Sequence, residues 1–271
     1  MNQVEANAFG QDALGVLGLV RALKNSLAPV NPIPPEVLSL ILDYPDVKRV
    51  LVTWTHVCRG WRNLFTSRSL LWTELAFANI DKTGAYIERS KFSPSKIILK
   101  TRGNDGRVLA DLFSLVIPHI HRVKSLTIYG ETFPNVIGYF RHRVPFLEEL
   151  NISVFHDHEP ALDDSLFNGD LSLRQLILSG IVIRLPGKGP ASLRTVHLGS
   201  YFSGHDISRL PDFFESASLL HTVLLEDSLP VLSDAPRKRI ISLSYLKVLS
   251  IGATTAHPIL LNHLHIPAGV C

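Results

Sequence analysis

The chain has 271 residues, of which 46% are hydrophobic, and its 27 basic and 24 acidic side chains give a formal net charge of +3. A chain of this length and composition can bury a substantial core, so predominant disorder is not indicated. The nearly balanced charge gives no field strong enough to predict a nucleic-acid partner. Two cysteines, Cys58 and Cys271, cannot build a disulfide framework, which favours a reducing compartment, the cytoplasm or the nucleus.

Residues 1–30 contain the apolar run Ala13–Leu23, which follows Glu5 and Asp12 and is interrupted by Arg21. A secretory signal needs a positively charged start instead, and the run is too short to cross a bilayer, so no membrane association is predicted. Apolar residues at helical spacing predict a helix that packs ahead of the next segment and ends near Ala28. These residues are Leu14, Leu17, Val20, Leu23 and Leu27.

The segment from Asn31 to Trp72 predicts three short helices. Prolines at the start and an acidic residue in the first turn are typical of a helix beginning, and Pro45 ends this first helix. A second apolar stripe begins at Val50 and breaks near Gly60. Cys58 lies on this stripe, so core packing is favoured over a role as a nucleophile. Helices this apolar should dock on the rest of the chain or recruit a partner.

Four short motifs occur in order within this segment. They are Ile33-Pro34-Pro35-Glu36-Val37-Leu38, Ile41-Leu42, Val57-Cys58-Arg59-Gly60-Trp61-Arg62 and Leu71-Trp72. Together they resemble an F-box in the form common among fungal F-box proteins. The resemblance implies that residues 31–74 bind a Skp-family adaptor and, through it, a cullin-RING ubiquitin ligase, while the following region selects the substrate.

The same resemblance implies an adaptor contact made by Ile33, Pro34, Pro35, Val37, Leu38, Ile41 and Leu42. The alternative is that these side chains form an intramolecular core for a helical cap on the next domain. Trp61 and Trp72 are expected to hold the module together and to dock it on the first repeat, because large aromatic side chains supply much of a small core.

Residues 75–271 predict a series of strands. Alternating apolar residues at Leu75–Phe77 and Ile97–Leu99 are typical of short strands. A pattern of the form Leu-x-x-Leu-x-Ile then begins at residues 123, 147, 173, 193, 220 and 246, at successive intervals of 24, 26, 20, 27 and 26 residues. This spacing resembles that of leucine-rich repeats, in which each unit adds one strand to a parallel sheet and returns by a helix or loop.

Amphipathic returns are predicted over residues 108–117 and 207–217. The consensus asparagine is missing, and Gly130, Gly180, Gly199 and Gly252 follow the strands instead. Residues 263–266 predict the start of another strand, with no polar capping unit after it, which indicates a truncated family member or a covering partner. The predicted fold is therefore an α+β or α/β solenoid: an N-terminal helix and linker, a three-helix F-box, and an irregular leucine-rich-repeat domain with a curved parallel sheet.

If the leucines point inward, the residues between them line the concave face, which is the usual binding face of repeat proteins. The alternative is that the charges on this face merely pair across strands, Glu148 or Glu149 with Arg174 or Lys124, each exposed pair contributing about 0.2–1 kcal/mol. Ser250 completes the central row of this face. The predicted substrate-binding residues are Thr127, Asn151, Arg174, Ile177, Arg194, His197, His221, Leu224 and Lys247.

No sequence signature of a hydrolase, a zinc protease or a phosphate-binding loop is present. The loop residues His156–Glu159, Asp163 and Asp164 are metal-compatible, but ligand types without a defined geometry are weak evidence, so no metal or cofactor is predicted. The predicted function is a non-catalytic substrate-recognition adaptor of an SCF-type ubiquitin ligase. The alternative is a leucine-rich-repeat scaffold that binds proteins outside a ligase, and a hydrolase or metal enzyme ranks below both.

Overall fold

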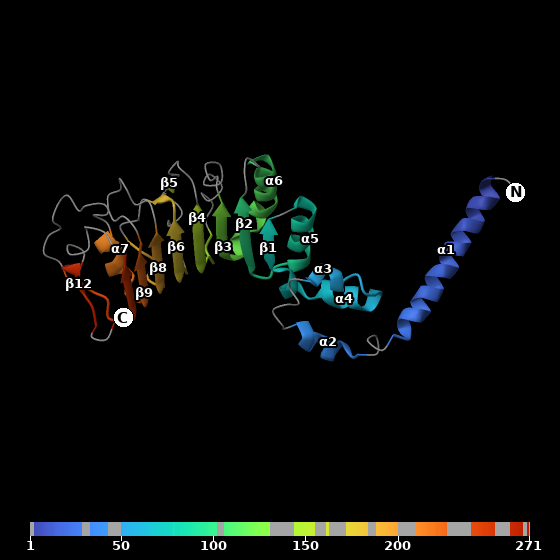
Figure 1. The fold of residues 1–271 in the computed structure, drawn as a ribbon, viewed down its shortest axis with the longest axis horizontal. Helices are drawn as coiled ribbons and strands as arrows, with labels where there is room; N and C mark the ends of the chain where they lie inside the picture. Colours follow the sequence, from blue (N-terminus) through green and yellow to red (C-terminus); the bar gives the residue numbers. More distant parts are fainter. Residues whose placement is uncertain are drawn as a thin grey trace. The chain divides into compact units, whose positions relative to one another are not determined.

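The chain divides into two compact units, residues 1–71 and 72–271, which are described separately. The predicted boundaries were 1–30 for the N-terminal helix and linker, 31–74 for the F-box and 75–271 for the repeat domain. The computed structural model describes residues 3–28, 33–42, 50–77, 79–101, 106–130, 144–154, 161–162, 172–183, 188–199, 210–226, 240–252, 261–267 and 270. Figure 1 shows the helices and strands of both units.

The first unit contains helices. In its described residues these are α1 (Gln3–Ser26), α2 (Pro35–Leu42), α3 (Leu51–Trp54), α4 (Arg59–Ser67) and the 3-10 helix η2 (Ser69–Trp72), which ends at the first residue of the second unit. No helix among the described residues is long and apolar enough to cross a membrane.

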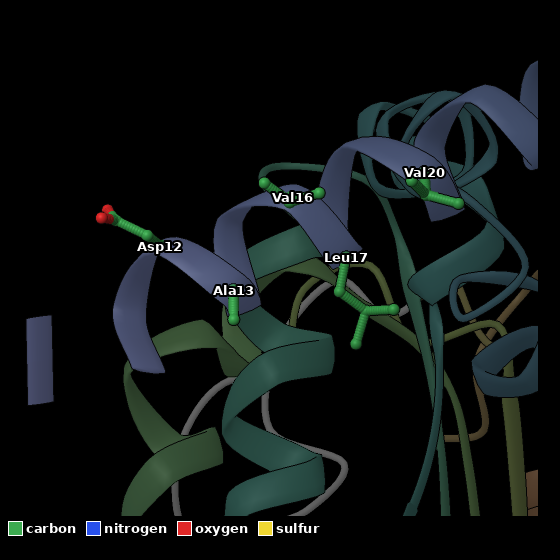
Figure 2. Close-up of a pocket in the computed structure, with 5 residues that line it drawn as sticks. All are labelled: Asp12, Ala13, Val16, Leu17 and Val20. Atoms are coloured by element: carbon green, nitrogen blue, oxygen red, sulfur yellow. The ribbon is translucent and has the colours of Figure 1, made fainter. Parts of the chain in front are cut away.

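Helix α1 does not pack as predicted. Every side chain from residue 11 to residue 24 is exposed, and Leu14 and Leu19 expose 68% and 72% of their surface. The apolar residues lie on all sides of the helix, so no single stripe is available for burial. Figure 2 shows a hollow on this helix, with Ala13 and Leu17 projecting to the same side. All of its lining residues, Asp12, Ala13, Val16, Leu17 and Val20, come from α1, so the hollow is a feature of one helix surface.

The predicted division of the apolar stripe that begins at Val50 into two helices is confirmed, but the break lies between Trp54 and Arg59 rather than at Gly60, which is inside α4. Cys58 has an extended backbone, with φ −155° and ψ 174°. The Thr55 hydroxyl donates to the Val52 carbonyl oxygen at 2.7 Å, and Arg62 Nε donates to the Thr55 carbonyl oxygen at 2.9 Å. The Val52 carbonyl oxygen also accepts from the Thr55 backbone N–H at 3.1 Å, so side-chain and backbone donors together close the end of α3.

The second unit is built on a parallel sheet that has eight strands in the described part of the chain. The strands are β1 (Glu74–Phe77), β2 (Ser95–Thr101), β3 (Val123–Gly130), β4 (Glu149–Val154), β6 (Gln175–Ser179), β8 (Thr195–Gly199), β9 (Thr222–Leu225) and β11 (Val248–Ile251). They lie side by side in this order (Figure 1). The predicted strands and the mixed α/β class are confirmed, whereas the repeat solenoid and its curvature stay predictions.

The core lies against one face of this sheet. Leu126 pairs with Leu150, and Leu150 with Leu176, and this row continues through Val196 and Val223. Every residue of this row is at most 3% exposed. Side chains alternate between the two faces of a strand, so placing the leucines on the core face places the intervening residues on the other. Burying these apolar rows supplies most of the stabilisation of the sheet.

Helices and shorter strands connect the main strands. They are α5 (Ile80–Ser90), α6 (Gly106–Val116), η3 (Ile117–Arg122), α7 (Leu210–Ser216), the pair β5 (Ala161–Leu162) and β7 (Val182–Ile183), and the pair β10 (Ile241–Ser242) and β12 (Leu264–His265). Helix α5, which the sequence analysis did not predict, packs against β1 and α6. The strand predicted at residues 263–266 exists as β12, but it pairs with β10 in a separate sheet.

A buried arginine fixes the end of α5. Arg122 Nη1 donates to Ser90 Oγ at 2.9 Å and to the Ser93 carbonyl oxygen at 3.0 Å, and Nη2 donates to the Ile87 carbonyl oxygen at 3.3 Å. Burial lowers the pKa of the Arg122 guanidinium. Its positive charge lies at the C-terminal end of the helix, where the helix dipole stabilises a cation.

Candidate functional site

Helix α2 carries the residues that sequence analysis assigned to an adaptor. Pro34 precedes the helix, and its carbonyl oxygen accepts from the backbone N–H groups of Val37 at 3.0 Å and Leu38 at 3.1 Å. Glu36 occupies the first turn, where a negative charge complements the helix dipole. The helix therefore begins as the prolines predict.

The predicted adaptor residues differ in accessibility. Pro34 and Val37 are exposed, and Ile33 and Ile41 are half-buried. Leu38 is only 6% exposed, so it belongs to the core of its own chain rather than to an open contact surface. The side chains of two predicted residues, Pro35 and Leu42, lie outside the described part.

An exposed apolar stripe runs along α2. Pro34, Val37 and Leu40 follow one another at intervals of three residues, which places them on one side of a helix. Val37 is 46% exposed and Leu40 is 66% exposed. We call these three residues the α2 stripe. Sequence reasoning missed Leu40, although its spacing from Val37 was visible.

The two tryptophans predicted to hold the module together belong to different units. In the first unit, Trp61 stacks on Trp54 with ring centroids 4.9 Å apart, and Phe65 lies 5.9 Å from Trp61. Trp72 is fully buried in the second unit, where the edge of Tyr86 meets its ring at 4.9 Å. The predicted docking of the module through both rings stays a prediction.

The predicted central row of the concave face is a single row in the sheet. Thr127 pairs with Asn151, Asn151 with Ile177, Ile177 with His197, and His197 with Leu224. Ser250 on β11 pairs with Leu224 and extends the row. Thr127 is buried, Ser250 is exposed and the others are half-buried. The structure therefore brings together residues spread over more than 100 positions of sequence, from 127 to 250.

Polar side chains extend this face toward the ends of the strands. Asn151 Nδ2 donates to the Tyr129 hydroxyl at 3.5 Å, and the Ser153 hydroxyl donates to Asn151 Oδ1 at 3.3 Å. Glu226 Oε1 lies 3.2 Å from His197 Nε2, which makes an ion pair when the imidazole is protonated, although the two atoms are not aligned as a hydrogen bond. Sequence reasoning missed Tyr129, Ser153 and Glu226, which continuing the strand alternation by one step would have found.

A second row lies where the strands begin. The backbone N–H of Glu148 donates to the Lys124 carbonyl oxygen at 2.8 Å, and that of Arg174 donates to the Glu148 carbonyl oxygen at 2.7 Å. Backbone hydrogen bonds of the same kind, each 2.8 Å long, join Arg194 to Arg174, His221 to Arg194 and Lys247 to His221. We call this set the edge row: Lys124, Glu148, Arg174, Arg194, His221 and Lys247.

The predicted cross-strand charge pairing occurs at one end of the edge row. Lys124 Nζ lies 2.8 Å from Glu148 Oε1. This hydrogen bond, together with the positive charges of Lys124 and Arg174, lowers the pKa of the Glu148 carboxyl. Glu149 instead accepts from the Ser125 hydroxyl at 2.9 Å. The pairing interpretation therefore accounts for Lys124 and Glu148, with Arg174 close enough for its charge to act on the same carboxyl. Among the described residues, no salt bridge is formed by Arg194 or Lys247.

A hollow of about 530 Å³ lies between α5 and η3. Ile87, Leu115, His119 and Arg122 line it with five other residues. Burial, with the positive charge of Arg122, lowers the pKa of His119. Arg122 Nη1 and Nη2 are bonded to carbonyl and hydroxyl oxygens near the end of α5, which gives this side chain a structural role, whereas its buried Nε has no hydrogen-bond partner among the described residues.

The metal-compatible residues His156–Glu159, Asp163 and Asp164 lie outside the described residues. Among the residues that are described, no group of three or more histidines, cysteines or acidic residues is arranged to hold a metal ion. Cys58 is half-buried at the start of α4. Comparison with known proteins found no family model and no curated protein that matches this chain.

Proposed function

We propose that this chain is a non-catalytic substrate-recognition adaptor of an SCF-type cullin-RING ubiquitin ligase. Residues 31–74 would act as an F-box that binds a Skp-family adaptor, and the sheet-containing unit would act as a leucine-rich-repeat receptor for a target protein. The proposal assigns the protein to the cytoplasm or the nucleus, where such ligases work.

The observation that carries the proposal is the α2 stripe. Its exposed apolar side chains lie on a proline-led helix within the segment that resembles an F-box. Contiguous exposed apolar residues are typical of a protein interaction surface. An amphipathic helix that is buried on one side, at Leu38, and apolar on the other suits a groove on a partner protein.

The second support is the order of the strands. Six copies of one sequence pattern supply β3, β4, β6, β8, β9 and β11, and these strands pair in chain order. Such an arrangement gives one extended face with a row of side chains from every copy, which suits the recognition of another protein.

The mechanism that follows is proximity. A chain that binds an adaptor through one surface and a target through another converts their encounter into an intramolecular event. The acceptor lysine of the target then stays near the ubiquitin-loaded enzyme, which supplies the chemistry. In this mechanism no residue of the chain touches the reacting atoms.

Co-purification of the full chain with a Skp-type adaptor tests the proposal. We expect the double substitution Val37→Asp and Leu40→Asp to abolish capture, because two charges would enter an apolar contact. Ile240→Asp is the matched control, since Ile240 is an apolar side chain of the second unit with 70% exposure. Leu38→Asp is unsuitable, because a charge at this buried position unfolds the module. If the wild-type chain captures no such adaptor, the proposal fails.

The buried side chain of Leu38 favours a second candidate function, a repeat scaffold that binds proteins outside a ligase. In that case α2 serves the core of its own unit and the α2 stripe has no adaptor to bind. Target binding without adaptor capture, in a chain with normal circular dichroism, would support the scaffold.

A further inference from the structure

Backbone hydrogen bonds join the residues of the edge row to one another. From Arg174 onward, the links Arg194 N to Arg174 O, His221 N to Arg194 O and Lys247 N to His221 O each measure 2.8 Å. Four consecutive strands therefore each present one basic residue at the same level. We call Arg174, Arg194, His221 and Lys247 the cationic row.

The cationic row is accessible. Arg174, Arg194 and Lys247 are exposed, and His221 is half-buried. Within the described ranges, no carboxylate forms an ion pair with Arg174, Arg194 or Lys247. The nearest acid in the row, Glu148, is bonded to Lys124 at 2.8 Å, and the charge of Arg174 acts on the same carboxyl without a direct ion pair. Like charges on neighbouring strands repel one another, so the row is arranged to meet negative charge from outside.

The neighbouring row does not neutralise this charge. One residue farther along each strand, Gln175 pairs with Thr195, Thr195 with Thr222, and Thr222 with Val248. These side chains are neutral, and three of them can form hydrogen bonds. A ligand on the cationic row therefore meets a neutral, mainly polar row beside it.

His221 can add a further donor. Its Nδ1 lies 2.7 Å from the Leu219 carbonyl oxygen, and a carbonyl oxygen only accepts, so Nδ1 carries the hydrogen in this contact. The ring stacks on Tyr245, with centroids 6.2 Å apart and an interplanar angle of 22°. The ring is thus held in place, and its Nε2 gains a hydrogen to donate when the imidazole is protonated.

The spacing suits an extended polypeptide. Neighbouring strands lie about 4.8 Å apart, so the cationic row spans about 15 Å. An extended chain rises about 3.3 Å per residue, so a segment of roughly five residues covers this length. Arginine offers a planar fork that pairs with carboxylates through two hydrogen bonds. A single line of cations in a chain of net charge +3 matches such a segment better than a nucleic acid, which needs a wider basic surface.

We infer that the target protein binds through an extended acidic segment that crosses the strands along the cationic row, with its carboxylates paired to Arg174, Arg194 and Lys247. This substrate class rests on the proposed function, because it describes the cargo of the same receptor unit.

Fluorescence anisotropy with the full chain tests the inference. The probe is a labelled unstructured peptide that alternates Glu and Ser, compared with its Gln counterpart, with a phosphoserine version and with a single-stranded oligonucleotide of equal charge. The test variant carries Arg174→Gln and Arg194→Gln. The matched control carries Lys96→Gln and Lys100→Gln, which remove the same charge from exposed positions on β2 at the other end of the sheet.

We expect the Glu peptide to bind, with an affinity that falls as salt increases, and to bind about five- to tenfold more weakly to the arginine variant. The control should bind as the wild type does. Tighter binding of the phosphoserine peptide that is also lost in the arginine variant would support the inference and identify a modified acidic segment. Equal binding of the Gln peptide, unchanged binding by the arginine variant, or preference for the oligonucleotide would each overturn it.

The α2 stripe separates this inference from the proposed function. Val37→Asp with Leu40→Asp should leave peptide binding unchanged, because the peptide contacts the second unit. If the wild-type chain binds the peptide through the cationic row but captures no adaptor, the ligase role fails and the acidic ligand stands. If adaptor capture succeeds while the arginine variant binds the peptide normally, the inferred acidic ligand fails and the ligase role stands.

Discussion

Replacing Arg122 tests how the second unit holds helix α5. Arg122→Met keeps the length of the side chain but removes three hydrogen bonds, to Ser90 Oγ and to the carbonyl oxygens of Ser93 and Ile87. A hydrogen bond from a charged donor contributes about 1.5–3 kcal/mol, so three such bonds at the lower end contribute about 4.5 kcal/mol. Part of this is offset, because burying the guanidinium is itself costly.

Two features reduce the expected loss further. Ser90 Oγ also donates to the Ile87 carbonyl oxygen at 2.9 Å, and this bond survives the substitution. Methionine also retains most of the apolar contacts of the arginine stem. We therefore expect Arg122→Met to lower the free energy of unfolding of the second unit by about 2–4 kcal/mol.

Urea unfolding followed by circular dichroism gives the global change, and amide hydrogen exchange over residues 80–90 reports on α5 itself. Arg89→Met is the control. The Arg89 guanidinium lies 4.3 Å from the Trp72 ring centroid, a cation–π contact that contributes about 0.5–1 kcal/mol to the free energy of unfolding, so its loss should be smaller than that of Arg122→Met. If Arg122→Met unfolds at the same urea concentration as the wild type, and exchange in α5 is unchanged, the assignment of Arg122 as the anchor of α5 is incorrect.

Two further predictions concern the same unit. Gly180 has φ +69°, and a Cβ there would collide with the Val154 carbonyl oxygen, so Gly180→Ala should lower the unfolding free energy by about 1–3 kcal/mol, measured by thermal unfolding. Gly84→Ala, where a Cβ meets nothing within 4 Å, should not destabilise the unit, and equal losses at both glycines would contradict the steric reasoning. The pKa of Glu148 is lowered chiefly by its hydrogen bond with Lys124, so its contribution to stability is present above its unfolded pKa and is lost as the pH falls through the folded pKa. Glu148→Gln should remove this part of the loss of stability at acid pH. A carboxyl titration by NMR that shows an ordinary pKa for Glu148 would refute the assigned hydrogen bond with Lys124.

The strands could be predicted from the sequence because their signal is local. Each copy of the leucine pattern fixes which residues face the core, and all copies share one phase, so Leu126, Leu150 and Leu176 had to align once the strands became neighbours. The rows of the opposite face, including Asn151 and His197, follow from the same alternation.

Other features depend on information that the pattern does not carry. Helix α5 has few apolar residues and contains Gly84, and its clearest signal was Asn79, whose side chain accepts from the Lys82 N–H at 3.0 Å. The pairing of β12 with β10 is a contact between distant segments. Leu38 could not be placed by spacing alone, because an apolar helix face is equally suited to a partner protein and to the core of its own chain.

The edge row and the α2 stripe also depend on contacts and orientations that the sequence pattern does not carry. Arg174, Arg194 and Lys247 could be assigned to one surface from the sequence, but only the backbone ladder shows that they occupy consecutive places in a single line. The accessibility of Leu40 likewise required the orientation of α2, which depends on how Leu38 packs.

The order of the strands in the main sheet has a consequence for how the protein is made. In the described part of the chain, each main-sheet strand after β1 hydrogen-bonds to the main-sheet strand that was synthesised just before it. The sheet can therefore grow on the ribosome by adding one strand at a time to an edge that already exists. No early segment has to wait for a late one before it can pair within that sheet, which shortens the time during which leucine-rich segments are open to aggregation.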